Sequence, residues 1–185
     1  MVVPFPPGRA KNAARATLGR RLGEIGFRDS VARDVWVSPL DEGGERGFYA
    51  VGLDFYPIAR MAYLWEGNGK NDVTKCITVR AYGAAVSTED PYIGSLLDTI
   101  RPSLSDFLGK HREQFISESI ATIVREYDAA GIDFDDNTSS KIREMHDSKI
   151  AVPYALLSAD DVERWADLIV PATRSAYDHA RTRVD

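Results

Sequence analysis

The sequence is poor in the residues that build most metal and cofactor sites. Cysteine occurs once, as Cys76, and histidine occurs three times among 185 residues. A single cysteine excludes an intramolecular disulfide, and the common structural zinc sites need at least two cysteines. No histidine has another histidine three or four positions away, so the His-Glu-x-x-His zinc pattern is absent. We therefore expect no resident cofactor.

Long apolar runs are also missing. No stretch approaches the roughly 20 apolar residues of a membrane-spanning helix, and the first residues lack the apolar core of a secretory signal. The net charge of -5 and the isoelectric point of about 5.3 disfavour nucleic-acid binding, which depends on a basic surface. We expect a cytoplasmic protein that binds neither membranes nor nucleic acid.

Phosphate-binding and nucleophile motifs are absent as well. Gly69 and Lys70 stand together, but Leu64 occupies the place of the first glycine of a phosphate loop and Asn71 replaces its Ser or Thr. The stretch predicts a hairpin turn instead. No catalytic residues can be assigned from motifs.

What remains is the composition of an ordinary globular domain. Hydrophobic residues make up 44% and charged residues 28% of the chain, whose length suffices to bury a core. We expect one domain over residues 1–185. It would have an irregular proline-rich start at 1–8, a helix and a sheet in 9–85, and a helical part in 86–185.

Apolar residues recur at helical spacing directly after the proline-rich start. Ala14, Leu18, Leu22 and Ile25 form one stripe, and Gly26 stands where a glycine ends a helix. We predict a helix that begins near residue 9. The glycines at 19 and 23 either weaken this helix or allow close packing on a sheet.

Four segments of the first half are rich in β-branched and aromatic residues, which is typical of strands. They span residues 34–39, 48–57, 60–66 and 74–83, and short polar turns join them. Such connections predict an antiparallel meander. In the second segment, Tyr49, Val51, Leu53 and Phe55 point to one face.

The second half shows helical periodicity. A helix is predicted from residue 112 until Gly131 stops it, and another begins at a capping box formed by Ser158 and Asp161. Together the elements predict an α+β fold, in which an antiparallel meander of three to four strands packs against an N-terminal helix and a C-terminal set of helices. The apolar stripe of the last helix comprises Val162, Trp165, Ile169, Ala172 and Ala176.

A group of polar and aromatic residues lies on successive predicted strands. If helices cover the aliphatic face, some members lie on the open face, where they suit a protein interface or a small ligand. A second layer that makes them core is an equally good interpretation. The group comprises Asp54, Tyr56, Tyr63, Trp65, Arg80 and Tyr82.

The stretch "GIDFDDNTSS" and the residues after it partly match a calcium loop. Asp133, Asp135, Asn137 and Glu144 fall on positions 1, 3, 5 and 12 of such a loop. However, position 6, where the loop turns on glycine, is a threonine, and position 9 is a lysine. The preferred interpretation is an acidic linker that caps the next helix.

The charges of the chain are unevenly distributed. Seven arginines and lysines crowd residues 9–33, whereas 126–136 carries acids and no bases. Such asymmetry can orient a partner or a dimer, although two solvated faces explain it more simply.

The run from Leu22 to Leu53 resembles a bacterial domain family of unknown function that occurs in immunity-type loci. The shared features are Gly26-Phe27 closing a helix, Val35-Trp36 in an aromatic strand, and the strand at 48–53. This chain lacks the run of basic residues that often follows the Gly-Phe pair. The resemblance implies no catalytic residues and favours a binding protein.

These observations rank three functions. We expect first a small soluble bacterial protein that acts by protein binding, either immunity-like or self-associating, so that its partner is another protein or a second copy. The alternatives are a metal-dependent hydrolase that uses the acids between 126 and 144, and a sheet that binds a small ligand.

Overall fold

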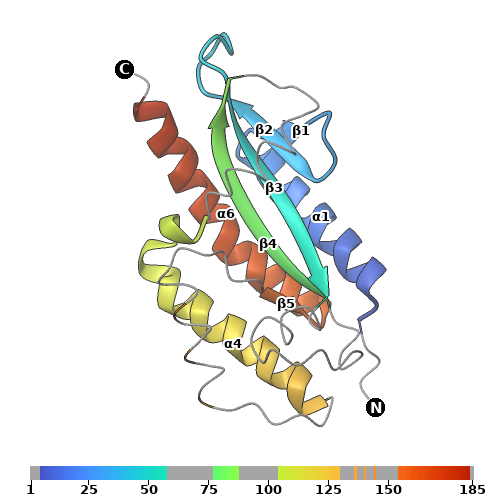
Figure 1. Ribbon diagram of the computed structural model, residues 1–185. Helices are drawn as coiled ribbons and strands as arrows, with labels where there is room; N and C mark the ends of the chain where they lie inside the picture. Colours follow the sequence, from blue (N-terminus) through green and yellow to red (C-terminus); the bar gives the residue numbers. More distant parts are fainter. Residues whose placement is uncertain are drawn as a thin grey trace.

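The computed structural model describes residues 5–57, 77–87, 104–129 and 154–183, together with the single positions 136, 140 and 144. Its centre is a five-stranded antiparallel sheet in the order β1-β2-β3-β4-β5 (Figure 1). The predicted α+β class is confirmed. The strands are β1 Arg28–Asp29, β2 Val35–Pro39, β3 Phe48–Pro57, β4 Ile77–Val86 and β5 Tyr154–Leu156.

β3 and β4 pair along their whole length and set the faces of the sheet. Their register places Leu53 opposite Ala81 and Phe55 opposite Val79. Because side chains alternate along a strand, these residues share one face, where Leu53, Val79 and Ala81 are buried and Phe55 packs against them. The predicted faces of the 48–57 strand are therefore confirmed.

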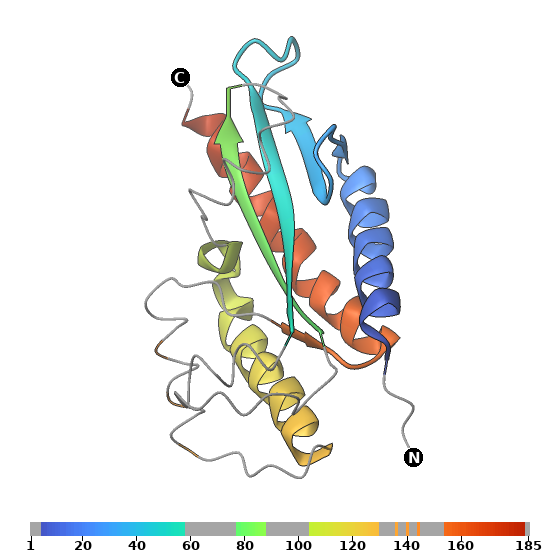
Figure 2. The ribbon, with the colours of Figure 1, turned by 45° about the vertical axis from the view of Figure 1, so that its right-hand side comes forward.

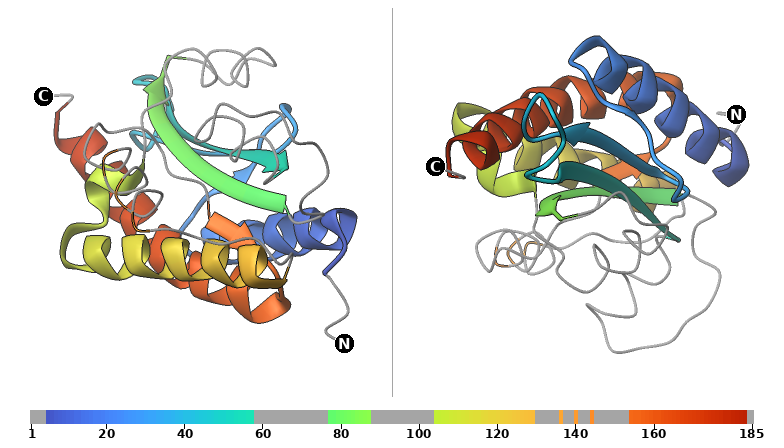
Figure 3. Two further views of the ribbon diagram at one scale, coloured as in Figure 1. Left: turned by 60° about the horizontal axis from the view of Figure 1, so that its bottom comes forward. Right: turned by 90° about the horizontal axis from the view of Figure 1, so that it is seen from above.

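Helices cover that face (Figure 2, Figure 3). α1 and α6 lie side by side and run in the same direction, because Thr17 contacts Glu163 and Arg21, one turn later, contacts Asp167. α4 packs against β5. In the described residues the helices are α1 Pro7–Glu24, η1 Leu104–Phe107, η2 Gly109–His111, α4 Arg112–Ala129 and α6 Ala159–Thr182.

α1 begins at Pro7, earlier than predicted, so the expectation of an irregular start is wrong at residues 7 and 8. Proline suits the first helical position, because its missing N–H would have no partner there and its fixed φ fits the helix. Gly26 follows the helix with φ +95°, as its predicted role as a stop requires. The buried side chains of α1 are Ala10, Ala14, Leu18 and Leu22.

α6 begins as predicted. Ser158 is its N-cap, and the Ser158 hydroxyl accepts a hydrogen bond from the backbone N–H of Asp161 at 3.2 Å. Pro171 lies inside the helix, which nevertheless continues to Thr182. The whole predicted stripe of this helix, from Val162 to Ala176, is buried.

The sheet has more strands than the three to four predicted. β1 and β5 contain two and three residues, which is too short for alternation to reveal a strand. β5 pairs with Ile77–Val79 of β4 and lies within 86–185, so the prediction that this part is helical is wrong there. The predicted strand at 60–66 lies outside the described residues.

The hairpin between β2 and β3 closes tightly at Gly47. The Leu40 N–H donates to the Gly47 carbonyl at 2.9 Å, and Gly47 has φ +93°. A Cβ atom added at Gly47 would lie 2.2 Å from the carbonyl oxygen of Val86 on the neighbouring strand. Only glycine fits this position.

Candidate functional site

Two residues of the predicted sheet patch meet in the structure. Asp54 on β3 and Arg80 on β4 are directly opposite each other, and Arg80 Nη2 lies 3.2 Å from Asp54 Oδ2. Both side chains are largely buried. The pair therefore forms a cross-strand ion pair of the kind that stabilises a sheet.

Tyr82 lies on the same outer face and is only 7% exposed. It belongs to a second, smaller cluster of buried residues on that face, together with Val35, Val37, Ala50 and Val86. Its ring thus contributes to packing. Tyr63, Trp65 and the side chain of Tyr56 lie outside the described residues, so a binding role for the whole patch stays a prediction.

The proposed calcium ligands are mostly outside the described residues. Of the four, only Glu144 is described; it is exposed and helical. Asp136 and Ser140 are also helical, and the Ser140 hydroxyl donates to the Asp136 carbonyl at 3.0 Å. Within the described residues no group of three or more metal-ligating side chains occurs. The metal site stays a prediction.

A groove of about 610 Å³ lies between α1 and the β1–β2 hairpin. Figure 2 shows these two elements at the edge of the sheet. This volume is within the usual range for binding sites. Its α1 wall consists of residues spaced three or four apart, so that they share one face of the helix. The groove is lined by Asn12, Arg15, Ala16, Gly19, Arg20, Asp29, Asp34 and Trp36.

An ion pair crosses one end of the groove, which we call the α1–β1 groove. The Arg15 Nε and Nη2 atoms donate to the two carboxylate oxygens of Asp34, the second at 2.8 Å. This bidentate hydrogen bond raises the pKa of Arg15. Asp34 has φ +62°, a left-handed conformation that aspartate tolerates in turns. These two charges neutralise each other.

Trp36 forms the floor of the α1–β1 groove beneath Gly19. The indole is 5% exposed, and a Cβ atom at Gly19 would lie 3.0 Å from its Nε1. The glycine therefore lets α1 approach the indole closely, as the packing interpretation of Gly19 predicts. Gly23 has no atom within 4 Å of its added Cβ, so that interpretation does not extend to it.

Asp29 presents both its backbone and its side chain at the edge. The Ser30 N–H donates to the Val35 carbonyl, and antiparallel pairing alternates, so the backbone of Asp29 points away from β2. Asp29 is opposite Trp36 and shares its face, which is the face of the groove. Among the described residues, Asp29 has no ion-pair or hydrogen-bond partner.

Beside this edge stands the turn that joins β1 to β2. Val31 in this turn is 72% exposed, and no other large hydrophobic side chain in the described part of the chain is exposed. Among the described strands, none pairs with the outer edge of β1, and such an edge can pair with an extended segment of another chain.

Two arginines of the first helix form ion pairs within the molecule. Arg21 Nη2 lies 2.7 Å from Glu163, and Arg21 also donates to Asp167, so that it links α1 to α6. The hydrogen bond to Asp167 raises the pKa of Arg21. Arg20 lies 3.3 Å from Glu24 and 3.9 Å from Glu163. These pairs explain part of the charge asymmetry as helix packing.

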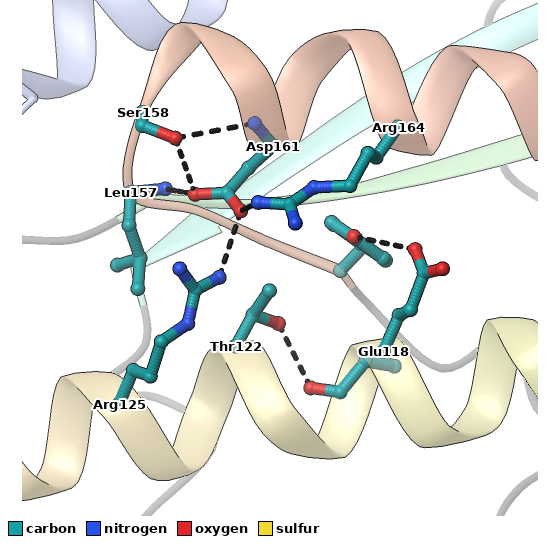
Figure 4. A network of polar contacts seen from close by, with 9 residues as sticks. Glu118, Thr122, Arg125, Leu157, Ser158, Asp161 and Arg164 are labelled. Carbon is teal, nitrogen blue, oxygen red and sulfur yellow. Dashed lines mark hydrogen bonds and ion pairs between the residues drawn. The ribbon is translucent and has the colours of Figure 1, made fainter.

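A polar network joins α4 to the start of α6 (Figure 4). Asp161 is fully buried, and its carboxylate accepts from the Leu157 N–H, the Ser158 hydroxyl, Arg125 and Arg164 at 2.7–3.1 Å. Four donors fully occupy this carboxylate. The arrangement caps and anchors a helix, and it leaves no oxygen of Asp161 for a substrate.

Sequence reasoning missed the α1–β1 groove. Its residues come from two segments whose proximity depends on the tertiary fold. The available signals were Gly19 on the helix and the acids at 29 and 34 on either side of a short turn, and neither signal alone indicates a site.

None of the described helices combines the length and the apolar character needed to cross a membrane. No family model matches the chain, and no similar protein was found among curated proteins or solved structures.

Proposed function

We propose that this protein acts by binding another protein, and that it receives an extended segment of that partner at the β1 edge of its sheet. The observation that carries the proposal is the outward-facing backbone of Asp29 beside the α1–β1 groove. An extended peptide that adds a strand gains affinity from backbone hydrogen bonds and specificity from neighbouring pockets. Exposed Val31 adds apolar contact area.

A second copy of the chain suits this edge poorly. When an antiparallel strand pairs with its own copy across a two-fold axis, odd-numbered residues lie opposite odd-numbered ones and even-numbered residues opposite even-numbered ones. Pairing centred on β1 therefore places Arg28 opposite Arg28 or Asp29 opposite Asp29. Like charges directly opposite destabilise a sheet. We infer that the partner differs from this protein.

The resemblance of Leu22–Leu53 to a family of immunity-type loci supports a more specific role. That segment contains β1, β2, the turn between them and the floor of the groove. The partner of an immunity-like protein would be a toxic protein of the same bacterium. A toxin gene beside the gene of this protein would support this role.

The binding edge can be tested with a displayed library of random peptides. Asp29→Pro removes the outward N–H, and a proline with its nitrogen facing away from the neighbouring strand is tolerated on an edge. We expect peptides selected on the wild type to lose binding to Asp29→Pro, and both proteins to unfold at similar urea concentrations. Absence of selected peptides, or equal binding by a folded Asp29→Pro variant, would refute the proposal.

A further inference from the structure

The α1–β1 groove has a chemical preference, which follows from the charges that already have partners. Arg15 and Asp34 form a bidentate pair, and Arg20 has Glu24 and Glu163 within 4 Å. The carboxylate of Asp29 has no such partner in the part of the chain that the structure describes. The unbalanced charge of the groove is therefore negative.

We propose that the groove accepts a lysine or arginine side chain of the partner segment, with Asp29 as its counter-ion. This inference rests on the proposed function and names the chemistry of the segment bound there. The net charge of -5 also favours a basic partner over an acidic one, because long-range attraction steers association.

The geometry identifies which residue of the segment is basic. A residue that exchanges both backbone hydrogen bonds with Asp29 has its side chain on the same face as Asp29. Asp29 shares that face with Trp36, so this side chain is directed to the α1–β1 groove. The residues before and after it point to the other face of the sheet. The residue of the segment that pairs with Asp29 is thus the position at which a positive charge is expected.

The floor of the groove suits a long basic side chain. Ala16 and Gly19 offer a small apolar surface above Trp36. The methylene stem of lysine or arginine covers such a surface while its charged end remains at the carboxylate. A glutamate in the same place would meet Asp29 and Asp34, and it would have to compete with Glu24 and Glu163 for Arg20.

The same displayed library tests the preference, with Asp29→Lys as the charge-reversed variant and Asp178→Lys on the far end of α6 as the matched control. Wild type and Asp178→Lys should enrich peptides with a lysine or arginine at one position. Asp29→Lys should enrich glutamate or aspartate there. A synthetic peptide of the wild-type consensus should bind Asp29→Asn about tenfold more weakly than wild type.

The outcomes separate this inference from the proposed function. If wild type selects peptides that Asp29→Asn still binds and Asp29→Pro does not, the edge is a binding site, because of these two variants only the proline variant removes the outward N–H. The selected peptides could instead be acidic or show no charge preference, or Asp29→Lys could select the same residues as wild type. Either result would refute the proposal of a basic side chain, while the proposal of a binding edge would stand. If Asp29→Pro binds the peptides equally, both fail.

Discussion

Asp161 shows how one buried charge can organise the junction of two helices. Its carboxylate has no contact with solvent. It is tolerated because the Leu157 N–H, the Ser158 hydroxyl and two arginines donate the hydrogen bonds that water would otherwise supply. Replacing a whole buried ion pair by apolar residues is often harmless, but removing one partner leaves the other groups unsatisfied. The stability of the α4–α6 junction should therefore depend on Asp161.

Asp161→Ala is expected to lower the free energy of unfolding by about 2–4 kcal/mol, because it removes the acceptor of the Leu157 N–H and the anchor for both arginines. Asp160→Ala, on the exposed side of the same helical turn, should cost about 0.5 kcal/mol. Urea unfolding measures both. Equal losses for the two variants would show that the network does not stabilise the junction.

Tyr49 should make stability sensitive to alkaline pH. Burial raises the pKa of Tyr49 far above the value of about 10 in the unfolded chain. Stability is then fully present below pH 10 and is lost as the pH rises further, since the unfolded tyrosine ionises first. Urea midpoints of Tyr49→Phe should fall less steeply above pH 10 than those of wild type. Identical slopes would contradict this.

At the scale of elements, glycines determine how closely the chain segments approach. Gly26 reverses the chain after α1, Gly19 admits the indole of Trp36, and Gly47 closes the β2–β3 hairpin against Val86. Of these, Gly47 combines a left-handed φ with contact to a rigid backbone atom. The neighbouring turn glycines, Gly43 and Gly44, lack that contact.

Alanine substitutions in the β2–β3 turn should therefore differ in cost. Gly47→Ala should destabilise the protein by more than about 2 kcal/mol, because strain and a clash with Val86 combine. Gly44→Ala, with φ +68° but only a side chain nearby, should cost about 1 kcal/mol. Gly43→Ala should change stability by less than about 0.5 kcal/mol. Thermal unfolding would reveal the order, and a harmless Gly47→Ala would contradict the structure.

At the scale of the whole molecule, local patterns were enough for the long elements. The α6 stripe, its capping box, and the alternation along β3 each depend on one segment, and each prediction is confirmed. β1 and β5 are too short to leave a pattern, and they become strands only because β2 and β4 offer them edges. The sheet patch contains an ion pair and a buried tyrosine, and sequence alone could not say whether their face of the sheet is open or covered.

The candidate site depends on the same long-range arrangement. Nothing in the sequence distinguishes Asp29 from other acids. It becomes a candidate binding residue because it lies at the edge of the sheet, beside the groove, where the other charges are paired. The sequence of one segment does not show which of its charged side chains form ion pairs with other segments. That information exists only when α1, α6 and the β1–β2 hairpin are placed together.

The most direct test of the central claim is the exchange rate of single backbone amide hydrogens, measured by NMR in the free protein and in the complex with a selected peptide. Strand addition at β1 predicts that the Asp29 amide exchanges much more slowly in the complex. The Arg28 and Ser30 amides, which already face β2, should change little. An Asp29 amide that exchanges equally fast in the saturated complex would contradict the account.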